Sequence, residues 1–367
     1  MPSGPETAHI EKIDVSAYTV PTDAPESDGT LEWDKTTIVL VEVASGSKRG
    51  LGYTYGDTAV AALIHELLVG VVKSRDALDV SGSWQAMVHA IRNLGRPGIS
   101  SMAVAAVDSA LWDLKGKLLN VPAAKLLGMV RDGVPVYGSG GFTSYSNQQL
   151  QSQLGGWVRE GIPRVKMKVG RQPERDSERV RAAREAIGGA AELFVDANGA
   201  YSRKQALSLA ERFREDGVCW FEEPVSSDDL EGLHMIRERC PAGMEIAAGE
   251  YGYDLPYFRR MLEAGAVDVL QADVTRCAGF TGFLEVAALC DAFMIPLSAH
   301  TAPSLHLPLG CAAPALRNIE YFHDHVRIEQ MFFDGAIRPK SGVLYPDLSR
   351  PGLGLELRRK DARRYAA

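Results

Sequence analysis

From residue 133 onward, short apolar runs alternate with helical patterns. The runs are rich in β-branched and aromatic residues and are typical of buried strands: GVPVYGS (133–139), RVKMKV (164–169), LFVDAN (193–198), VCWFEEP (218–224), EIAAGE (245–250), VDVLQAD (267–273), IPLSAH (295–300) and NIEYF (318–322). Helices fit between them, and Ser202 with Gln205 forms a capping-box pattern before one of these helices. Such strand–helix units predict parallel strands in an α/β fold. We favour a closed (β/α) barrel over a doubly wound sheet, because no G-x-G-x-x-G motif follows the first strand.

The residues before this region have a different pattern. Apolar alternation and helical spacing predict an antiparallel α+β block with strands at 9–20, 36–44 and 51–55 and helices at 57–74, 82–93 and 101–118. The stretch TDAPESDGTLE (22–32) is rich in Pro, Gly, Ser and acidic residues, which predicts a mobile loop. We therefore expect three parts: an α+β block at 1–130, a barrel at 131–335, and a segment at 336–367 that returns to the first block.

Composition narrows the class of protein. The chain of 367 residues is 46% hydrophobic and 24% charged, which is ordinary for a globular protein. Its formal net charge is −7 and it has no basic run, so a nucleic-acid partner is disfavoured. It has no apolar run long enough for a membrane span and no signal-peptide pattern at its start. The five scattered cysteines, without a C-x-x-C pair, fit reduced thiols, so we expect a cytoplasmic protein.

Ionisable or polar residues end strand after strand of the predicted barrel. They are Lys166 and Lys168, Asp196 and Asn198, Glu222 and Glu223, Glu250, Asp273, His300 and Glu320. The leading positions lie 20 to 28 residues apart, about one strand–helix unit, so they converge on one barrel face, where such folds place their chemistry. Lys166 and Lys168 share one strand face. Each disfavours the other's protonated form, so either they form a solvated strand end or one of them is a base.

Three successive strand ends carry Asp196, Glu222 and Glu250, an all-oxygen ligand set. This set suits Mg²⁺, whereas Zn²⁺ more often recruits His or Cys. The lysines precede the set along the chain and the Asp273–His300 pair follows it. A bound substrate would therefore have lysine on one side and histidine on the other, and Asp273 can set the tautomer of His300.

The strand ends carry the motifs K-x-K at 166–168, D-x-N at 196–198, F-E-E-P at 221–224 and G-E at 249–250. In this order, the motifs resemble the enolase superfamily, specifically its mandelate racemase/muconate lactonizing enzyme subgroup. The resemblance covers nearly the whole chain. It implies a modified TIM barrel of the (β/α)7β type, with the first block as an N-terminal α+β capping domain. It also implies one Mg²⁺ per subunit, held by Asp196, Glu222 and Glu250.

The same resemblance implies roles for the other strand-end residues. Lys168 and the His300–Asp273 pair act as acid/base catalysts, and Glu320 hydrogen-bonds the substrate carboxylate. We expect Lys166 to lower the pKa of Lys168, so that Lys168 can act as a base. We also expect the substrate to be bound by Asn198, Lys166 and Glu320. The implied partner is a small carboxylate substrate, with no nucleic acid and no membrane, and the chain is expected to form a homo-oligomer.

The hypotheses that follow from this resemblance share one step, the removal of a proton α to a carboxylate. Two different reactions can follow that step. Loss of a β-hydroxyl makes the enzyme an acid-sugar dehydratase, a lyase acting on an aldonate or aldarate. Return of a proton to the opposite face makes it a racemase or epimerase of a 2-hydroxy acid. We favour dehydration because members with this pattern are commonly acid-sugar dehydratases, and because the polar stretch 22–32 suits a polyol better than an aromatic acid.

Two other hypotheses explain the strand-end residues less well. A Schiff-base lysine enzyme would leave three carboxylates unexplained, and a degraded, non-catalytic site would not keep every position filled. Glu223 is expected to orient Glu222. His323 and His325 are expected to pack rather than line the pocket. For Tyr55 and Arg276, packing and ligand contact both stay open.

Overall fold

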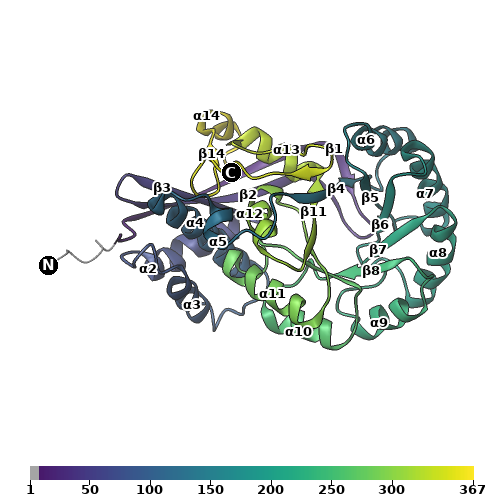
Figure 1. The fold of residues 1–367 in the computed structure, drawn as a ribbon, viewed down its shortest axis with the longest axis horizontal. Helices are drawn as coiled ribbons and strands as arrows, with labels where there is room; N and C mark the ends of the chain where they lie inside the picture. Colours follow the sequence, from purple (N-terminus) through teal and green to yellow (C-terminus); the bar gives the residue numbers. More distant parts are fainter. Residues whose placement is uncertain (1–7) are drawn as a thin grey trace.

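Eight parallel strands close into a barrel in the computed structural model, which describes residues 8–367 (Figure 1). The strands are β4 (Val134–Gly140), β5 (Arg164–Lys168), β6 (Glu192–Asp196), β7 (Val218–Glu222), β8 (Glu245–Ala248), β9 (Val269–Ala272), β10 (Leu297–Ala299) and β11 (Leu316–Phe322). Neighbours pair in chain order, and β11 pairs back with β4 to complete the ring. The prediction of a closed (β/α) barrel is confirmed.

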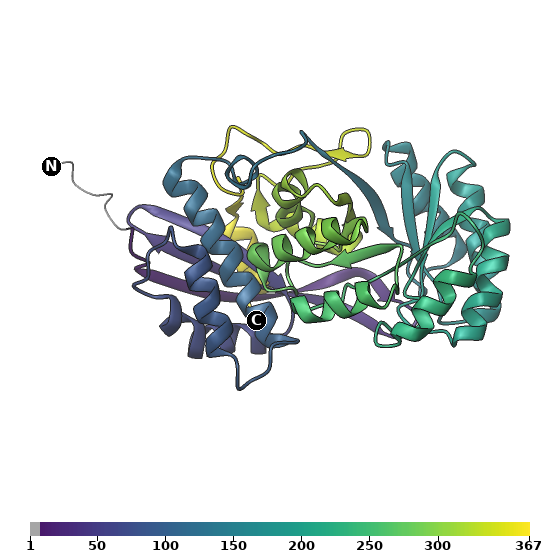
Figure 2. The same ribbon diagram turned by 60° about the horizontal axis from the view of Figure 1, so that its bottom comes forward.

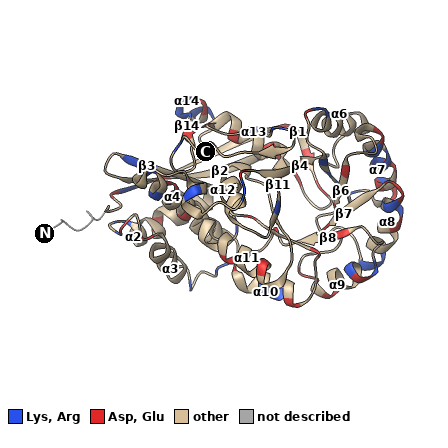
Figure 3. Ribbon diagram, viewed as in Figure 1, with Lys and Arg blue, Asp and Glu red and all other residues tan. Residues whose placement is uncertain are grey.

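Seven helices connect these eight strands and cover the barrel's outer face (Figure 1). They are α6 (Asn147–Arg159), α7 (Pro173–Ile187), α8 (Arg203–Glu215), α9 (Leu230–Arg239), α10 (Leu255–Glu263), α11 (Gly279–Phe293) and α12 (Pro303–Ala312). The predicted capping box begins α8, where the Ser202 side chain accepts from the Gln205 backbone N–H. Charged residues of both signs are interspersed along the outer helices (Figure 3).

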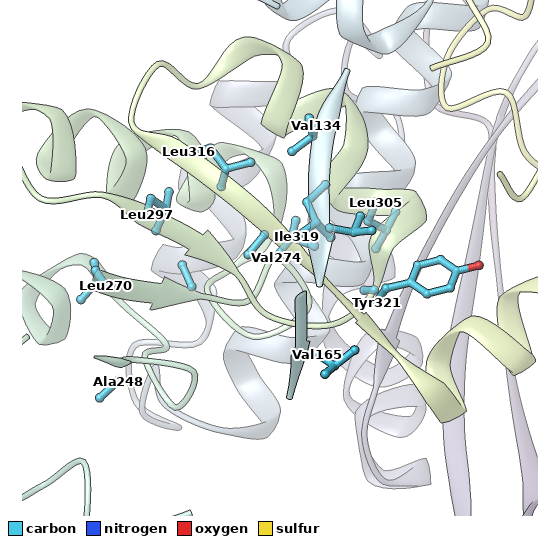
Figure 4. Packing of buried hydrophobic residues seen from close by; sticks show 14 of the residues in the cluster. Val134, Val165, Ala248, Leu270, Val274, Leu297, Leu305, Leu316, Ile319 and Tyr321 are labelled. Carbon is cyan, nitrogen blue, oxygen red and sulfur yellow. The ribbon is translucent and has the colours of Figure 1, made fainter. Parts of the chain in front are cut away.

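A cluster of apolar and aromatic side chains packs inside the barrel beneath its polar mouth. Tyr137, Phe194, Trp220 and Val269 are fully buried there, and the rings of Phe194 and Trp220 stack with centroids 4.9 Å apart. A larger apolar layer fills the space between strands and helices, including Val134, Leu270, Leu297, Leu305, Leu316 and Ile319 (Figure 4). The mouth residues therefore stand on a rigid, closely packed base.

An antiparallel sheet with helices on one face caps the barrel (Figures 1 and 2). The sheet contains β1 (Lys12–Ser27), β2 (Glu32–Ser45) and β3 (Lys48–Tyr55). The helical segments are α1 (Thr58–Leu63), the π-helical turn η1 (Ile64–Leu68), α2 (Val69–Val72), α3 (Val80–Ala90), α4 (Ile99–Leu119) and α5 (Ala123–Leu127). The long strands β1 and β2 run from this sheet across to the barrel mouth in both views.

The prediction of a mobile loop at 22–32 is wrong for most of these residues. Strand β1 continues to Ser27 and β2 begins at Glu32, so only residues 28–31 form the turn. Tertiary contacts hold this hairpin tip: the hydroxyls of Ser27 and Thr143 lie 2.6 Å apart, and Ser144 donates to the Pro25 carbonyl at 2.6 Å. Pro, Gly and acidic residues predict a turn, but these contacts with distant residues extend the strands beyond it.

The chain after the barrel crosses back over the capping sheet. It contains α13 (His323–Phe332), β12 (Phe333–Asp334), β13 (Val343–Leu344), β14 (Glu356–Leu357), α14 (Arg359–Ala362) and the 3₁₀ turn η2 (Arg363–Tyr365). Leu353 N–H donates to Asp113 of α4 at 2.6 Å, and the Ala367 N–H donates to the Ala17 carbonyl at 3.0 Å. Within residues 8–367, no helix combines the length and apolar character that a membrane crossing requires.

Candidate active site

The strand-end residues singled out in the sequence gather at one mouth of the barrel and are almost completely shielded from solvent. Lys166 of β5, Asp196 of β6 and Glu222 of β7 are each 0% exposed. Lys168, Glu250, Asp273, His300 and Glu320 are also buried. Because successive parallel strands end at the same level, residues far apart in the chain become neighbours here.

Asp196, Glu222 and Glu250 form a compact carboxylate trio. Each offers one oxygen, and the three oxygens lie within 4.8 Å of one another. Burial and the carboxylate of Asp196 raise the pKa of Glu222 to about 8, which shows the strain of crowding like charges. Three convergent carboxylates with no nitrogen or sulfur donor fit a hard divalent cation such as Mg²⁺.

Two ammonium groups face this trio from β5. The Lys168 amine donates to Asp196 Oδ2 at 2.5 Å. The Lys166 amine contacts Glu222 and lies 2.8 Å from Glu320 Oε1. Both lysines therefore point inward on one face, as strand alternation predicts, and neither forms a solvated strand end.

The pKa of Lys168 differs from the prediction of a lowered value. Burial and the Lys166 ammonium lower this pKa, the latter as predicted, but the carboxylates of Asp196, Glu250 and Glu222 together outweigh both, and the pKa is raised. The pKa of Lys166 is raised as well, because the carboxylates of Glu222 and Glu320 overcome the effect of burial. Sequence reasoning placed the two lysines together but missed the direct ion pair with Asp196.

On the opposite side of the trio stands an imidazole held by a carboxylate. His300 Nδ1 lies 2.9 Å from Asp273 Oδ2, while the Thr275 backbone N–H and hydroxyl both donate to Asp273 Oδ1 at 2.7 Å. The other ring nitrogen, Nε2, lies 3.0 Å from Glu250 Oε2 and 3.5 Å from Glu320 Oε2. Asp273 thus orients the ring so that Nε2 faces the centre of the site.

The charge around His300 favours its protonated form. Burial lowers the pKa of His300, but the carboxylates of Glu250 and Glu320 outweigh this effect and raise it to about 10. The pKa of Glu320 is lowered to about 2, since the ammonium of Lys166 and the imidazolium overcome burial. The mouth therefore holds cationic groups on both sides of an anionic centre.

A cavity of about 420 Å³ opens above these groups. It is lined by Lys168, Glu250 and His300 at its base and by Trp33, Lys35 and other residues of the β1–β2 hairpin at its rim. Besides His300, the ring-bearing residues that line it are Trp33, Tyr55, Tyr251, Phe322 and His325. A volume of this size suits a small-molecule ligand.

Several cavity residues were not identified correctly from the sequence. His325 was expected to pack, but it lines the cavity, with its ring stacked on Tyr55 at a centroid distance of 3.5 Å. Trp33, Lys35 and Thr301 were missed altogether. The only local signal for Trp33 and Lys35 was their place directly after the polar stretch 22–32.

The remaining candidates lie around the mouth. The Asn198 backbone N–H donates to Asp196 Oδ1 at 2.9 Å. Asn198 also lines the cavity, and its side-chain Oδ1 is buried with no hydrogen-bond partner among residues 8–367. Arg276 donates to the Glu250 carbonyl at 3.1 Å and lies over the Tyr251 ring. Glu223 is buried and no hydrogen bond reaches its Oε1 from the described residues.

A capped parallel barrel whose mouth gathers acids, amines and an imidazole has the architecture of an enolase-superfamily enzyme. Residues 149–362 match the family described as enolase C-terminal domain-like, and residues 12–128 match the mandelate racemase / muconate lactonizing enzyme, N-terminal domain. The chain belongs to the mandelate racemase/muconate lactonizing enzyme family of the enolase superfamily.

Relatives with named activities act on sugar acids. A 3,6-anhydro-alpha-L-galactonate cycloisomerase from Streptomyces coelicolor is 32% identical over 361 residues, 94% of this chain and 98% of the relative. An L-talarate/galactarate dehydratase from Salmonella typhimurium is 29% identical over 370 residues, 97% of this chain and 90% of the relative. The family resemblance is confirmed, while the relatives divide between lyases and isomerases.

Solved structures of relatives share the whole fold. A mandelate racemase/muconate lactonizing enzyme-like protein from Rubrobacter xylanophilus is 58% identical with a TM-score of 0.96, covering 98% of this chain and 100% of that one. A racemase from Streptomyces coelicolor with bound magnesium is 31% identical with a TM-score of 0.91, covering 98% and 100%. The Salmonella dehydratase, solved with Mg and L-lyxarohydroxamate, is 27% identical with a TM-score of 0.89, covering 100% and 95%. Magnesium is therefore the cofactor of this family, as predicted.

Proposed function

We propose that the protein is a Mg²⁺-dependent acid-sugar dehydratase. It removes the proton α to the carboxylate of an aldonate or aldarate and then eliminates the β-hydroxyl as water, leaving a 2-keto-3-deoxy acid. One observation carries the proposal: Lys168 and His300 face the same carboxylate trio from opposite sides. The dehydratases among the relatives support the sugar-acid substrate.

The residues that would hold Mg²⁺ are Asp196, Glu222 and Glu250. Bound there, the ion would supply positive charge that stabilises the enediolate dianion and neutralises the Asp196 carboxylate beside Lys168. A base and an acid on opposite sides of the substrate are the other requirement, and the chain itself supplies both.

Proton transfers are assigned to two groups. With the Asp196 carboxylate neutralised, Lys168 loses the main contribution that raises its pKa, so its neutral amine can take the proton from C2 of the substrate. The electron pair left on C2 expels the hydroxyl from C3. The imidazolium of His300 protonates that hydroxyl as it leaves, so water is released and His300 becomes neutral. The resulting enol takes a proton at C3 and releases the proton of its C2 hydroxyl, which gives the keto acid.

Three residues are assigned to holding the substrate. The ammonium of Lys166 faces the position where a substrate carboxylate would replace its contact with Glu320. Glu320 and the free side-chain oxygen of Asn198 are placed to hydrogen-bond the substrate. Asp273 acts on the reaction only through His300, because its carboxylate holds the imidazole in position.

A library of aldonic and aldaric acids tests this function. Incubated with the protein and Mg²⁺, at least one acid is expected to give a 2-keto acid, detected as its semicarbazone. Absence of keto acid from the whole library would refute the dehydratase assignment. Lys168→Ala and His300→Asn should each abolish turnover while circular dichroism shows an intact fold.

Isomerisation is the second candidate, favoured by the same pair of acid/base groups and by the cycloisomerases among the relatives. If His300 returns a proton to the opposite face of C2, the product is an epimer and no water is lost. Exchange of the C2 hydrogen in D₂O without keto acid formation would select this candidate over dehydration.

We also propose a capping domain at 1–130, a barrel at 131–335 and a returning segment at 336–367, in a cytoplasmic homo-oligomer. The assembly is tested by light scattering after size-exclusion chromatography. A mass equal to one chain of 39.8 kDa would contradict the oligomer.

A further inference from the structure

A second group of metal-ligating side chains lies outside the carboxylate trio. Asp23 and Glu26 belong to β1, and His323 is the first residue of α13. Each offers one ligand atom, and these atoms lie within 4.8 Å of one another. His323 Nε2 is 2.9 Å from Asp23 Oδ2 and 3.2 Å from Asp23 Oδ1. We call these three residues the β1–α13 group.

The fold brings the group together through two irregularities. The pairing register of β1 with β2 shifts between Pro21 and Glu26, so the strand bulges where Asp23 lies. Strand β11 passes into α13 at Phe322 and His323 without a connecting loop. The far end of β1 thereby meets the barrel rim, where the long strands reach the barrel in Figures 1 and 2.

Glu26 lacks the partners that a buried carboxylate normally has. The residue is 0% exposed, its Oε2 accepts from Trp33 Nε1 at 2.8 Å, and its Oε1 accepts no hydrogen bond from any residue that the structure describes. Burial and the carboxylates of Asp324 and Asp23 raise its pKa to about 8. A buried carboxyl oxygen without a partner is unfavourable, so its retention calls for an explanation.

The nearby cation does not supply the missing partner. The guanidinium of Arg327 donates to Asp324 Oδ1 and to the Pro21 carbonyl, each at 2.6 Å. Asp324 is in turn bound by the Thr36 hydroxyl. These contacts satisfy Arg327 and Asp324 and leave Glu26 Oε1 without a partner among the described residues, while one oxygen of Glu26 lies within 4.8 Å of ligand atoms of Asp23 and His323.

We propose that Asp23, Glu26 and His323 bind a divalent transition-metal ion, such as Zn²⁺, separate from the Mg²⁺ of the barrel. One imidazole and two carboxylates form a ligand set typical of Zn²⁺ and its neighbours, whereas Mg²⁺ prefers oxygen ligands alone. The ion joins the capping strand β1 to the barrel. It lies next to Phe322, whose ring lines the cavity, so it fixes the cavity rim.

Zn²⁺ binding measured by equilibrium dialysis, in excess Mg²⁺, tests the site. The full-length wild type is compared with Glu26→Gln and His323→Ala. The glutamine keeps an oxygen for Trp33 Nε1 and removes the charge, so the variant is expected to fold. His65→Ala is the matched control, because His65 is an exposed histidine 3.5 Å from Glu66 in the capping helices.

Compared with the wild type, Glu26→Gln and His323→Ala are each expected to bind one fewer Zn²⁺ per chain. His65→Ala is expected to bind as much Zn²⁺ as the wild type. Zn²⁺ should also raise the melting temperature of the wild type and of His65→Ala, and this rise should be lost in the other two. Equal Zn²⁺ binding by all four proteins would overturn the proposal. Loss of Zn²⁺ binding in His323→Ala alone would overturn the three-ligand site. Because neither readout depends on turnover, a failed dehydratase assignment would not affect the result.

Discussion

At the scale of single residues, Asp273 determines which nitrogen of His300 faces the carboxylate trio. Both donors of Thr275 hold its Oδ1, so Oδ2 is directed at His300 Nδ1. In Asp273→Asn the amide group would face Nδ1 and favour the other tautomer. We expect kcat to fall by about 10²–10⁴-fold with the fold intact.

Nitrogen-15 NMR of the histidine ring checks the cause of that loss. Recorded above the His300 pKa of about 10, so that the ring is neutral, the expected spectrum shows its remaining proton moved between ring nitrogens in Asp273→Asn. A loss of activity without any tautomer change would mean that Asp273 acts in another way. His234→Asn, at an exposed histidine whose ring contacts only the Gly265 carbonyl, is the matched control.

His306 is a buried residue whose protonation is predicted to limit stability in acid. Its Nδ1 contacts the Thr301 carbonyl and its Nε2 accepts from the Val274 N–H, so the ring is neutral when folded. Burial lowers its pKa to about 4, against 6.5 for an ordinary histidine. The unfolded chain therefore binds more protons between these values, and stability falls as the pH drops from 6.5 toward 4, by roughly 3 kcal/mol in total.

Urea unfolding between pH 7 and pH 5 measures this effect. The wild type should lose free energy of unfolding as the pH falls, and His306→Gln, which has no titrating ring, should lose less. An identical pH dependence in the two proteins would show that His306 does not contribute.

Residue identities at the mouth were predictable, whereas their interactions were not. The positions of Lys168, Asp196 and His300 follow from strand spacing alone. The raised pKa of Lys168 depends on which carboxylate oxygen its amine meets, and strand spacing does not specify that. His325 and Trp33 were misjudged or missed because their roles depend on how the hairpin tip folds over the barrel.

At the scale of elements, β3 approaches α4 more closely than a side chain permits. A Cβ added at Gly52 would lie 2.3 Å from the Ala106 carbonyl oxygen and 2.4 Å from the Ala110 nitrogen. Because backbone on both sides must move, Gly52→Ala is expected to lower the free energy of unfolding by about 1–3 kcal/mol.

Gly70 provides the matched control for this substitution. It lies in α2, and a Cβ there would meet nothing within 4 Å. Gly70→Ala should therefore be neutral or stabilise by up to about 1 kcal/mol. Urea unfolding of both variants checks the pair, and an equal effect of the two substitutions would contradict the close approach of β3 to α4.

Element boundaries were predicted best where periodicity is strong. All eight barrel strands and α4 lie where their apolar patterns place them. The stretch 22–32 was misjudged because Pro, Gly and acidic residues report local turn preference only. Its extended backbone depends on Thr143 and Ser144, which are more than 100 residues away in sequence.

At the scale of the whole molecule, the barrel was predictable because one strand–helix unit recurs along the chain. The barrel closes because β11 pairs with β4, and no local sequence pattern predicts that pairing. The return of the C-terminal segment to β1 and α4 also depends on long-range contacts, such as that between Leu353 and Asp113. Convergence of the strand ends on one mouth follows from closure, so the active-site assignment depends on the barrel.

The central claim is that this mouth removes a proton α to a carboxylate with the help of a divalent cation. Proton NMR in D₂O, with a sugar acid found in the library screen, tests it most directly. The account predicts that the C2 proton signal is lost with Mg²⁺, persists with EDTA, and persists in the Lys168→Ala/His300→Asn double variant. Loss of that signal in EDTA or in the double variant would contradict the account.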